Sequence, residues 1–242
     1  MKKIQAIHHN EDHSLKENEQ SSKIEIASFF DENGDQTAIN ELLENKTTKT
    51  YLKKAVIFLE GTMPNELYFI NKGKVKITKA NDSGKEYMMT IRKSGDFFGY
   101  LALMKNEKYP ISAYALEPTS ISIIPKADFF SLLHTNRIVA NRFIKMLTEN
   151  IVEKEEQLLS LAYNSVRKRV AEALVRLHKK YKIEGKLHTE IVILREDLAN
   201  MVGTAKETVI RTLSDFKEEK LVKIKGSRIT ILNLHGLEHI IA

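Results

Sequence analysis

The sequence predicts an α+β protein with three parts: an N-terminal antiparallel β-roll (a double-stranded β-helix, or jelly-roll), one long helix, and a C-terminal winged helix-turn-helix. Three observations support this prediction. Short β-prone runs separated by glycines occupy residues 51–125, and a sustained heptad stripe follows at residues 140–161. Two short amphipathic helices with a glycine-containing turn between them are then predicted at residues 195–211.

The composition describes a soluble globular chain. With 242 residues, 42% hydrophobic and 29% charged, it has room for one large or two ordinary domains. It contains no cysteine, which excludes disulfides, thiolate zinc sites, cysteine-ligated iron–sulfur clusters and cysteine nucleophiles. No apolar run approaches a membrane span and the N-terminus lacks the apolar core of a signal peptide, so we expect a cytoplasmic protein with no membrane partner.

The net charge of +6 is concentrated at one end of the chain. From Tyr163 onward there are 16 Lys and Arg against 10 Asp and Glu, whereas the preceding residues hold 22 of each sign. A neutral body with a basic end is typical of a nucleic-acid-binding domain attached to another module.

The N-terminal residues show little periodicity. Residues 1–24 are polar and charged, which predicts a flexible tail, and short helices are expected at 24–30 and 38–43. The tail carries His8, His9 and His13, but three histidines in a flexible tail are a weak metal signal. We therefore predict no metal site.

Six β-prone runs follow: AVIFLE, ELYFINKG, KVKITKA, EYMMTIRK, ISAYALE and SISIIP. Glycines at 61, 73, 84 and 95 separate several of them at intervals of 12, 11 and 11 residues. Strands at such spacing, with turn residues between them, indicate an all-β roll or sandwich. Metal-dependent enzymes of this fold place histidines on their strands, but none occurs between His13 and His134. The metalloenzyme interpretation therefore fails, and no catalytic constellation supports another enzyme.

A heptad stripe follows the roll. Its apolar positions alternate in steps of 4 and 3, with Lys154 as the one interruption: Ala140, Ile144, Leu147, Ile151, Leu158 and Leu161. This pattern favours a coiled coil between two copies of a helix over residues 135–161, about 40 Å long at 1.5 Å per residue. The alternative is one long helix buried against its own domain. A second apolar line, Val139, Phe143 and Met146, can pack the same helix on the roll. Lys154 is a candidate pocket position. An ammonium buried between two paired helices is unfavourable unless another group hydrogen-bonds to it or neutralises its charge.

The C-terminal part begins where Tyr163-Asn164-Ser165 breaks the long helix, with Ser165 as the N-cap of the next helix. A strand-like IVIL run at 191–194 then precedes the helix-turn-helix. After it, LVKIKGSRITILN predicts a hairpin with a glycine-first turn at Gly226-Ser227. A hairpin directly after the second helix is a wing. The second helix of a helix-turn-helix enters the DNA major groove. The presence of a wing therefore favours a DNA-binding domain and disfavours an ordinary helical hairpin packed into a core.

The order of these parts resembles the family of the cyclic-AMP receptor protein and the fumarate–nitrate reduction regulator, dimeric bacterial transcription factors. The resemblance covers about residues 38–234. It is strongest in TYLKKAVIFLEGTMPNELYFINKGKVKI in the roll, LAYNSVRKRVAEALVRL at the hinge and AKETVIRTLSDFKEEKLV in the recognition helix. It implies double-stranded DNA, a second copy of the chain and RNA polymerase as partners.

The resemblance also implies roles for residues of the recognition helix. Glu207 and Arg211 occupy the positions that read a G·C-containing half-site, because a carboxylate accepts from cytosine N4 and arginine is bidentate to guanine. Lys206 stands at a third base-contacting position that is usually arginine, so its guanine contact would be weaker. Ile210 replaces glycine or serine and can pack on a thymine methyl, which leaves the preference at that base open.

Two further residues, Thr208 and Arg195, are predicted phosphate contacts. Glu207 has an alternative role, because Thr204-Ala-Lys-Glu207 matches a capping box in which the glutamate would bond the cap N–H. We favour the DNA contact.

The effector site departs from the family pattern. Tyr100 replaces a ribose-binding glutamate and Ile111 replaces a phosphate-binding arginine. The complete candidate pocket comprises Gly99, Tyr100, Leu101, Ala102, Ile111 and Ser112 in the roll, with Lys154 and Glu155 on the long helix. Without the arginine a buried phosphate would lack its charge partner, so we expect no response to cyclic AMP.

Other effectors are also constrained. An iron–sulfur cluster is excluded by the lack of cysteine, and haem is disfavoured because the roll has no histidine ligand. The cofactor stays unknown: an unidentified ligand and no ligand are both open.

The predicted function is a homodimeric, sequence-specific DNA-binding regulator. Its rivals are a metal- or ligand-dependent β-roll enzyme and a nonspecific architectural DNA binder. The expected organisation is a tail at 1–24, a sensor roll at 25–134, a dimerisation helix and hinge at 135–163, and a winged-helix DNA-binding domain at 164–242.

Overall fold

The structure, a computed structural model, describes residues 45–82, 86–182 and 189–242. The expected tail and the two expected N-terminal helices lie outside the described residues. What is described divides into two compact units, one of residues up to Lys76 with Arg92–Leu147 and one of Ile77–Ile91 with Thr148–Ala242. Each unit is described by itself.

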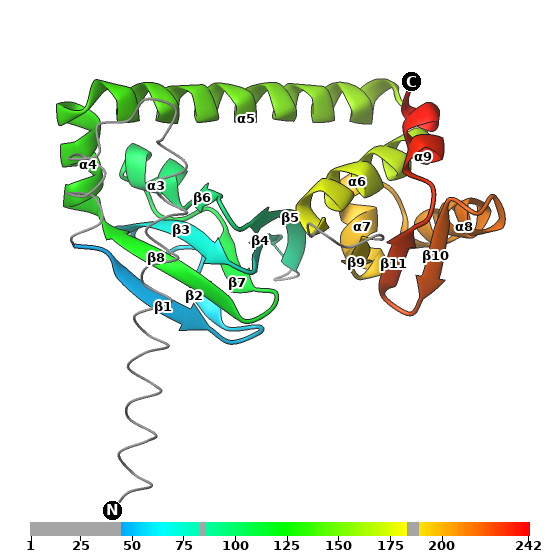
Figure 1. Cartoon of the computed structure of the whole chain (residues 1–242), viewed down its shortest axis with the longest axis horizontal. Helices are drawn as coiled ribbons and strands as arrows, with labels where there is room; N and C mark the ends of the chain where they lie inside the picture. Colours follow the sequence, from blue (N-terminus) through cyan, green and yellow to red (C-terminus); the bar gives the residue numbers. More distant parts are fainter. Residues whose placement is uncertain (1–44, 83–85, 183–188) are drawn as a thin grey trace, which may run out of the picture. The chain divides into compact units, whose positions relative to one another are not determined.

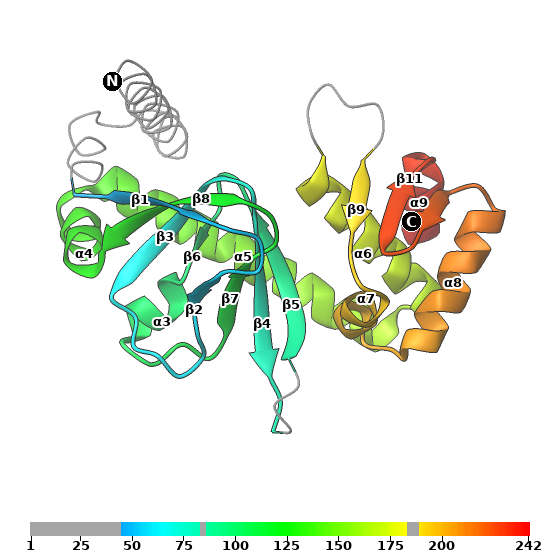
Figure 2. The same ribbon diagram turned by 90° about the horizontal axis from the view of Figure 1, so that it is seen from below.

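Two four-stranded sheets form the predicted β-roll (Figures 1 and 2). The first has the order β1 (Thr47–Tyr51), β8 (Thr119–Pro125), β3 (Glu66–Lys72) and β6 (Phe97–Phe98). The second has the order β2 (Val56–Phe58), β7 (Ser112–Ala115), β4 (Lys74–Ala80) and β5 (Glu86–Lys93). The pairs β1–β8, β2–β7, β3–β6 and β3–β8 are antiparallel, as expected; β3 and β8, for example, pair Leu67 with Ile124.

Strand β3 is buried on both faces, which explains its continuous apolar run. Leu67 and Phe69 point to one face and pack with Phe97, Phe129 and Phe143 in a hydrophobic core. Successive side chains of a strand alternate between faces. Their neighbour Tyr68 accordingly packs in a different set of rings, against Phe58 and Phe98.

Four short elements around the roll were not predicted from the sequence: β1, β6 and the helices α3 (Tyr100–Lys105) and α4 (Lys126–Thr135). The sequence of β1, TTKTY, lacks apolar alternation and becomes a strand by pairing with β8. Helix α4 ends one residue before Asn136, whose Oδ1 accepts hydrogen bonds from the N–H groups of Ile138 and Val139 at 3.0 Å. This cap separates α4 from the long helix.

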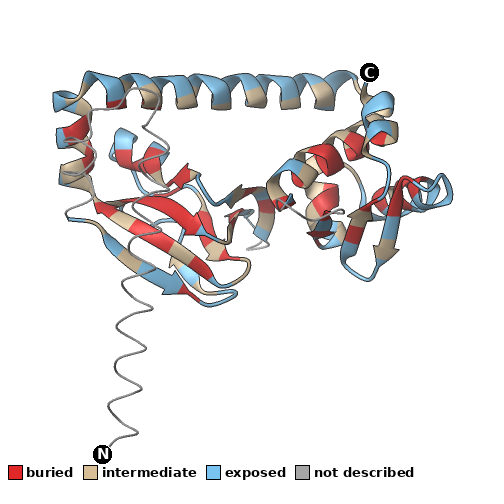
Figure 3. Cartoon of the chain, viewed as in Figure 1, coloured by how far each residue is buried: buried red, intermediate tan, exposed pale blue. Residues whose placement is uncertain are grey.

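The long helix α5 runs from Arg137 to Tyr163. Val139 and Phe143 are buried in the core of the first unit, and Met146 packs against it, so the second apolar line is confirmed. Exposed residues recur along the whole helix (Figure 3). Its packing within the protomer thus leaves a second face of α5 open to solvent.

The second unit contains a winged helix-turn-helix (Figure 1). Its elements are α6 (Val166–Tyr181), β9 (Glu190–Val192), α7 (Arg195–Val202), α8 (Lys206–Glu218), β10 (Val222–Lys225), β11 (Arg228–Ile231) and α9 (Leu234–Ile241). Ser165 caps α6 as predicted, since its Oγ accepts from the Lys168 N–H at 3.2 Å. Strands β10, β11 and β9 form one antiparallel sheet. The predicted fold class is therefore confirmed, with α9 as an additional helix.

Among the described residues, no helix is long and apolar enough to cross a membrane. That same part of the chain contains no group of three or more His, Cys, Asp or Glu residues placed to hold a metal ion. His8, His9 and His13 lie outside it.

Candidate nucleic-acid interface

The turn between α7 and α8 is built on Gly203. Its φ of +63° lies in the left-handed region that favours glycine, and it terminates α7. The following N–H, of Thr204, donates to the Ala199 carbonyl at 3.1 Å, which satisfies a carbonyl at the helix end. Helix α8 therefore starts only three residues after Gly203, at Lys206, as the helix-turn-helix pattern requires.

Helix α8 has one buried and one exposed face. The buried residues are Val209, Thr212, Leu213 and Phe216. The exposed residues at its N-terminal half are Lys206, Glu207, Ile210 and Arg211, and Thr208 is half-buried. The side chains predicted to read bases thus share a solvent-facing surface at the end of the helix that a helix-turn-helix presents to DNA.

The capping-box alternative for Glu207 is wrong. The N-cap of α8 is Ala205, not Thr204, and no side chain caps the helix. Glu207 is consequently the second residue of the helix rather than the third, and its exposed carboxylate stays available.

Arg195 supports the wing. Its Nη2 donates to the Gly226 carbonyl at 2.8 Å, and its Nη1 lies 3.5 Å from the Ile193 carbonyl oxygen. Burial lowers the pKa of Arg195 from its usual value. The first residue of α7 is thereby tied to the tip of the β10–β11 hairpin, a role that the sequence did not reveal.

The wing carries basic residues that sequence reasoning did not single out. Lys225 and Arg228 face each other across the Gly226-Ser227 turn, and both are exposed together with Lys223. Arg228 Nη1 also donates to Glu190 Oε1 of β9 at 2.6 Å. The alternation of lysines in the VKIK run of β10 was the available signal, since it places Lys223 and Lys225 on one face of the hairpin.

Three of the six roll residues predicted to hold an effector are buried. Tyr100, Ala102 and Ser112 are at most 6% exposed, whereas Leu101 is exposed and Ile111 is half-buried. Ser112 Oγ accepts a hydrogen bond from the Glu60 N–H at 2.9 Å, so it is engaged within the fold.

An aromatic cluster, made of Phe58, Tyr68, Phe98 and Tyr109, lies beside Gly99. Each ring is at most 6% exposed. Phe58 and Tyr109 stack at 3.9 Å between centroids with an interplanar angle of 11°, and Tyr68 and Phe98 lie 5.1 Å apart. A Cβ added to Gly99 would lie only 3.0 Å from Cδ2 of Tyr68 and 3.4 Å from Oη of Tyr109. The start of α3 is therefore in direct packing contact with these rings.

The two tyrosine hydroxyls of this cluster interact with Glu66. Tyr68 Oη donates to Glu66 Oε2 at 2.9 Å, and Tyr109 Oη donates to the Glu66 carbonyl at 3.4 Å. Burial raises the pKa of Tyr109 to about 12 and raises that of Tyr68 as well. Both phenols are thus neutral at physiological pH and engaged with Glu66, and the cluster contributes aromatic surface but no cation.

Lys154 and Glu155 belong to the second unit, where both are exposed on α5. Lys154 Nζ donates to Gln157 Oε1 at 3.0 Å. The eight predicted effector residues are therefore divided between the two units, with six in the first.

The predicted dimer stripe is largely uncovered within one chain. Ile144, Ile151 and Leu158 are 60%, 58% and 66% exposed. Leu161 is 43% exposed, whereas Ala140 and Leu147 are half-buried and Leu147 packs against the core of the first unit. Within one chain, much of this apolar row on α5 is therefore exposed to solvent.

Comparison with known proteins agrees with both halves of the architecture. Residues 48–136 match the cyclic nucleotide-binding domain family, and residues 168–240 match the Crp-like helix-turn-helix domain family. The cyclic AMP receptor protein of Thermus thermophilus is 27% identical over 79% of this chain and 87% of its own length. The anaerobic regulatory protein of Bacillus subtilis is 29% identical over 80% of this chain and 83% of its own length.

Solved structures share the fold. A CRP/FNR-family transcriptional regulator from Thermus thermophilus superposes with a TM-score of 0.68 and 20% identity, covering 81% of this chain and 98% of that one. At that identity the likeness concerns the fold alone. The two matched domain families and the curated regulators identify the protein as a member of the CRP/FNR family of helix-turn-helix transcription regulators.

Proposed function

We propose that the protein is a homodimer that regulates transcription by binding one pseudo-palindromic DNA site. The observation that carries the proposal is the exposed face of α8, where Lys206, Glu207, Ile210 and Arg211 surround the N-terminal end of the helix. A carboxylate and a guanidinium four residues apart can address a C·G base pair and its neighbour from one groove.

Contacts in the site divide into two kinds. Glu207 accepts from cytosine N4, Arg211 donates to guanine O6 and N7, and Lys206 adds a less directional contact. Ile210 packs on whichever base edge lies between them. Thr208 and Arg195 contact phosphates and set the register without reading sequence.

The exposed stripe of α5 supports dimerisation. Ile144, Ile151 and Leu158 recur at heptad spacing, and a partner helix would cover them in a coiled coil. Two α8 helices would then enter successive major grooves, with half-sites about 34–36 Å apart.

The test is a ratio of affinities at one fixed salt concentration. A duplex recovered from a random DNA pool and a duplex with the same bases shuffled are titrated with the full chain. We expect the recovered duplex to bind about 10³-fold more tightly or better. Equal affinities would instead identify a nonspecific architectural DNA binder.

Cyclic AMP is not the proposed effector. A cyclic phosphate needs a charge partner when it is buried. Ile111 supplies none, and the rings beside Gly99 supply neutral phenols. The proposal leaves two regulatory modes, an unidentified ligand of the roll or ligand-independent binding, and an iron–sulfur cluster is excluded by the absence of cysteine.

Cyclic AMP is therefore expected to leave both the melting temperature and the operator affinity unchanged. The full chain is melted with and without millimolar cyclic AMP, with AMP as the matched control nucleotide. A ligand present at 100 times its Kd stabilises a protein by about 2.7 kcal/mol, which such melts readily detect. A saturable rise in melting temperature with cyclic AMP, and not with AMP, would contradict this expectation.

Replacing Arg195 by Ala is expected to weaken binding to every DNA sequence by a similar factor. The change removes a predicted phosphate contact and also the bond from Nη2 to the Gly226 carbonyl that supports the wing. The logarithmic salt slope should fall by about one, as for the loss of one phosphate contact. Affinities of the selected and shuffled duplexes over a salt series measure this, with Lys217→Ala on the exposed far end of α8 as control. A loss confined to the selected duplex would show that Arg195 reads a base.

The remaining proposals follow from the same assignment. The roll at residues 25–134 senses, α5 and its end at 135–163 dimerise and transmit, and residues 164–242 bind DNA. RNA polymerase is the proposed protein partner and the cytoplasm the proposed location, because a regulator must meet both promoter DNA and polymerase. No enzymatic activity is proposed.

A further inference from the structure

The corner between α5 and α6 is held by one arginine. Arg169 Nη1 donates to the carbonyls of Leu161 and Asn164 at 3.1 and 3.2 Å, and its Nη2 donates to the Gly203 carbonyl at 3.3 Å. Leu161 and Asn164 lie at the end of α5, whereas Gly203 is the C-cap of α7. One planar guanidinium thus bridges the end of the long helix and the turn of the helix-turn-helix.

The chemistry of the three acceptors explains why a cation lies there. The last carbonyls of a helix have no partner within the helix and carry the negative end of its dipole. At this corner the ends of α5 and α7 converge on the same side chain. A rigid fork with a permanent charge can serve both ends at once, which a lysine ammonium cannot do with the same geometry.

A second clamp lies one turn further along α6. Glu172 accepts hydrogen bonds from Ser160 Oγ and, at 2.8 Å, from Asn164 Nδ2. Residues three apart on a helix share a face, so Arg169 and Glu172 grip the end of α5 from the same side of α6. Asn164, in the Tyr163–Ser165 segment predicted from the sequence to be a hinge, is consequently held to α6 by both Arg169 and Glu172.

Packing reinforces these bonds. A Cβ added to Gly203 would lie 2.8 Å from Cδ2 of Leu161. The last apolar residue of the heptad stripe therefore packs on the turn that precedes the recognition helix, in addition to the carbonyl contact through Arg169.

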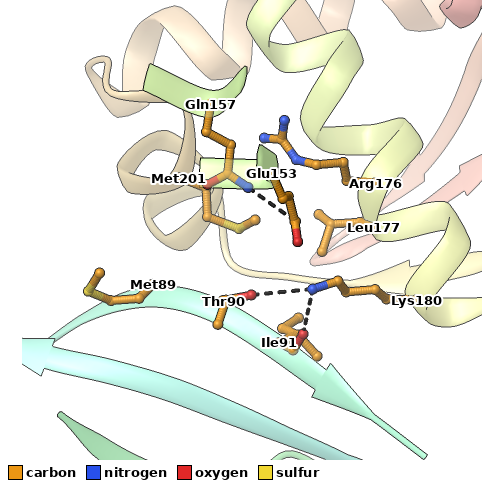
Figure 4. A pocket seen from close by; sticks show the side chains of 9 residues that line it. All are labelled: Met89, Thr90, Ile91, Glu153, Gln157, Arg176, Leu177, Lys180 and Met201. Atoms are coloured by element: carbon orange, nitrogen blue, oxygen red, sulfur yellow. Dashed lines mark hydrogen bonds between the residues drawn. The ribbon is translucent and has the colours of Figure 1, made fainter. Parts of the chain in front are cut away.

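The polar face of α6 continues beyond the clamp. Arg176 lies near Glu172 and Glu153. Lys180 Nζ donates to the Ile91 carbonyl at 2.9 Å and to Thr90 Oγ1 at 3.3 Å, and Figure 4 shows these two bonds beside Arg176 and Glu153. All of these residues belong to the second unit. Polar residues on successive turns of this face of α6 thus contact different parts of the second unit. Among these, Arg169 is the residue that bonds the turn between α7 and α8.

We infer that Arg169 is a positioning residue that fixes each recognition helix relative to the dimerisation helix and thereby sets the half-site spacing that the dimer accepts. The inference rests on the proposed function. If the two α8 helices are held rigidly to the paired α5 helices, their separation is fixed, and an operator with another spacing cannot be matched on both halves. If the Arg169 bonds are removed, each α8 helix can change its orientation relative to α5 independently of the other.

The experiment compares operators that differ only in spacing. The selected operator and versions with one base pair added to or removed from its centre are titrated with wild-type protein and with Arg169→Ala. Wild type should lose about tenfold or more in affinity on either altered spacing, because half-site separation is a geometric requirement. Arg169→Ala should bind the three operators within about twofold of one another, the usual scatter between independent changes.

Two variants keep the test interpretable. Arg169→Lys retains the charge without the fork and should show the same flattening, which covers the case in which Arg169→Ala fails to fold. Lys179→Ala, an exposed residue of α6, should keep the wild-type spacing preference.

The outcomes separate the two proposals. An equal loss of affinity at all three spacings, with the preference intact in both Arg169 variants, would overturn the inference and leave Arg169 a merely stabilising residue. A wild-type protein that shows no spacing preference would instead contradict the proposed binding of a pseudo-palindrome by a dimer.

Discussion

Ile151→Asp is expected to convert the protein to a monomer and to abolish tight operator binding. Ile151 lies in the middle of the exposed stripe of α5 and is 58% exposed in a single chain. In a two-fold coiled coil the substitution would bury a carboxylate opposite its own symmetry mate. An uncompensated buried charge costs about 3–5 kcal/mol, and the symmetric dimer would bury two such carboxylates facing each other. Because the side chain is largely exposed within the protomer, the fold of each chain should survive.

Sedimentation measures the first effect and operator titration the second. Val152→Asp is the matched control, since Val152 is also exposed and apolar but lies outside the stripe. It should remain a dimer and keep its affinity. If Ile151→Asp still sediments as a dimer, α5 is not the dimerisation seam.

Arg211→Ala is expected to cost roughly 1–3 kcal/mol at the selected operator and to relax specificity at one base pair. The residue is exposed on α8 and contributes nothing to the buried face formed by Val209, Leu213 and Phe216, so the loss should not reflect unfolding. The physical cause is the loss of two parallel hydrogen bonds to one guanine edge.

Affinities for the operator and for its single-base variants measure this effect. Arg211→Lys should restore charge but not base discrimination, because an ammonium cannot form the bidentate contact. If Arg211→Ala weakens selected and shuffled DNA equally, the residue contacts phosphate and not a base.

The sequence predicted the elements whose residue pattern is visible within the element itself. The heptad of α5, the Ser165 cap that begins α6 and the pattern of the helix-turn-helix and wing are all visible in consecutive residues, and the structure contains each of these elements. The elements that were missed take their shape from partners elsewhere in the chain. β1 is a polar run that pairs with β8, and α3 is only six residues long.

The candidate site was predictable to a similar degree. The outward face of α8 follows from helical periodicity, so Lys206, Glu207, Ile210 and Arg211 could be placed from the sequence. The capping box failed because a difference of one residue in the start of α8 changes which residue caps it, and local patterns do not fix helix ends that closely. The bond from Arg195 to Gly226, 31 residues apart, depends on the tertiary fold and has no local signal.

The effector region divides in the same way. The replacements at Tyr100 and Ile111 are visible against the family pattern and predict the loss of a nucleotide site. The packing of Phe58 and Tyr109 against Gly99 is not visible, because these rings come from separate strands and loops. Only the structure connects the altered motif with a neighbouring aromatic cluster.

Selection of bound sequences from a random DNA pool tests the central claim most directly. The full chain is incubated with the pool at physiological salt, and the retained duplexes are sequenced, with the Ile151→Asp variant as a parallel sample. If a dimer binds DNA with the α8 helix of each chain, we expect a two-fold symmetric motif. Its G·C-containing half-sites should be separated by about one helical turn, 10–10.5 base pairs from centre to centre. It also predicts that the Ile151→Asp sample loses the symmetric motif. Recovery of no motif, or of a single asymmetric motif from wild-type protein, would contradict the account.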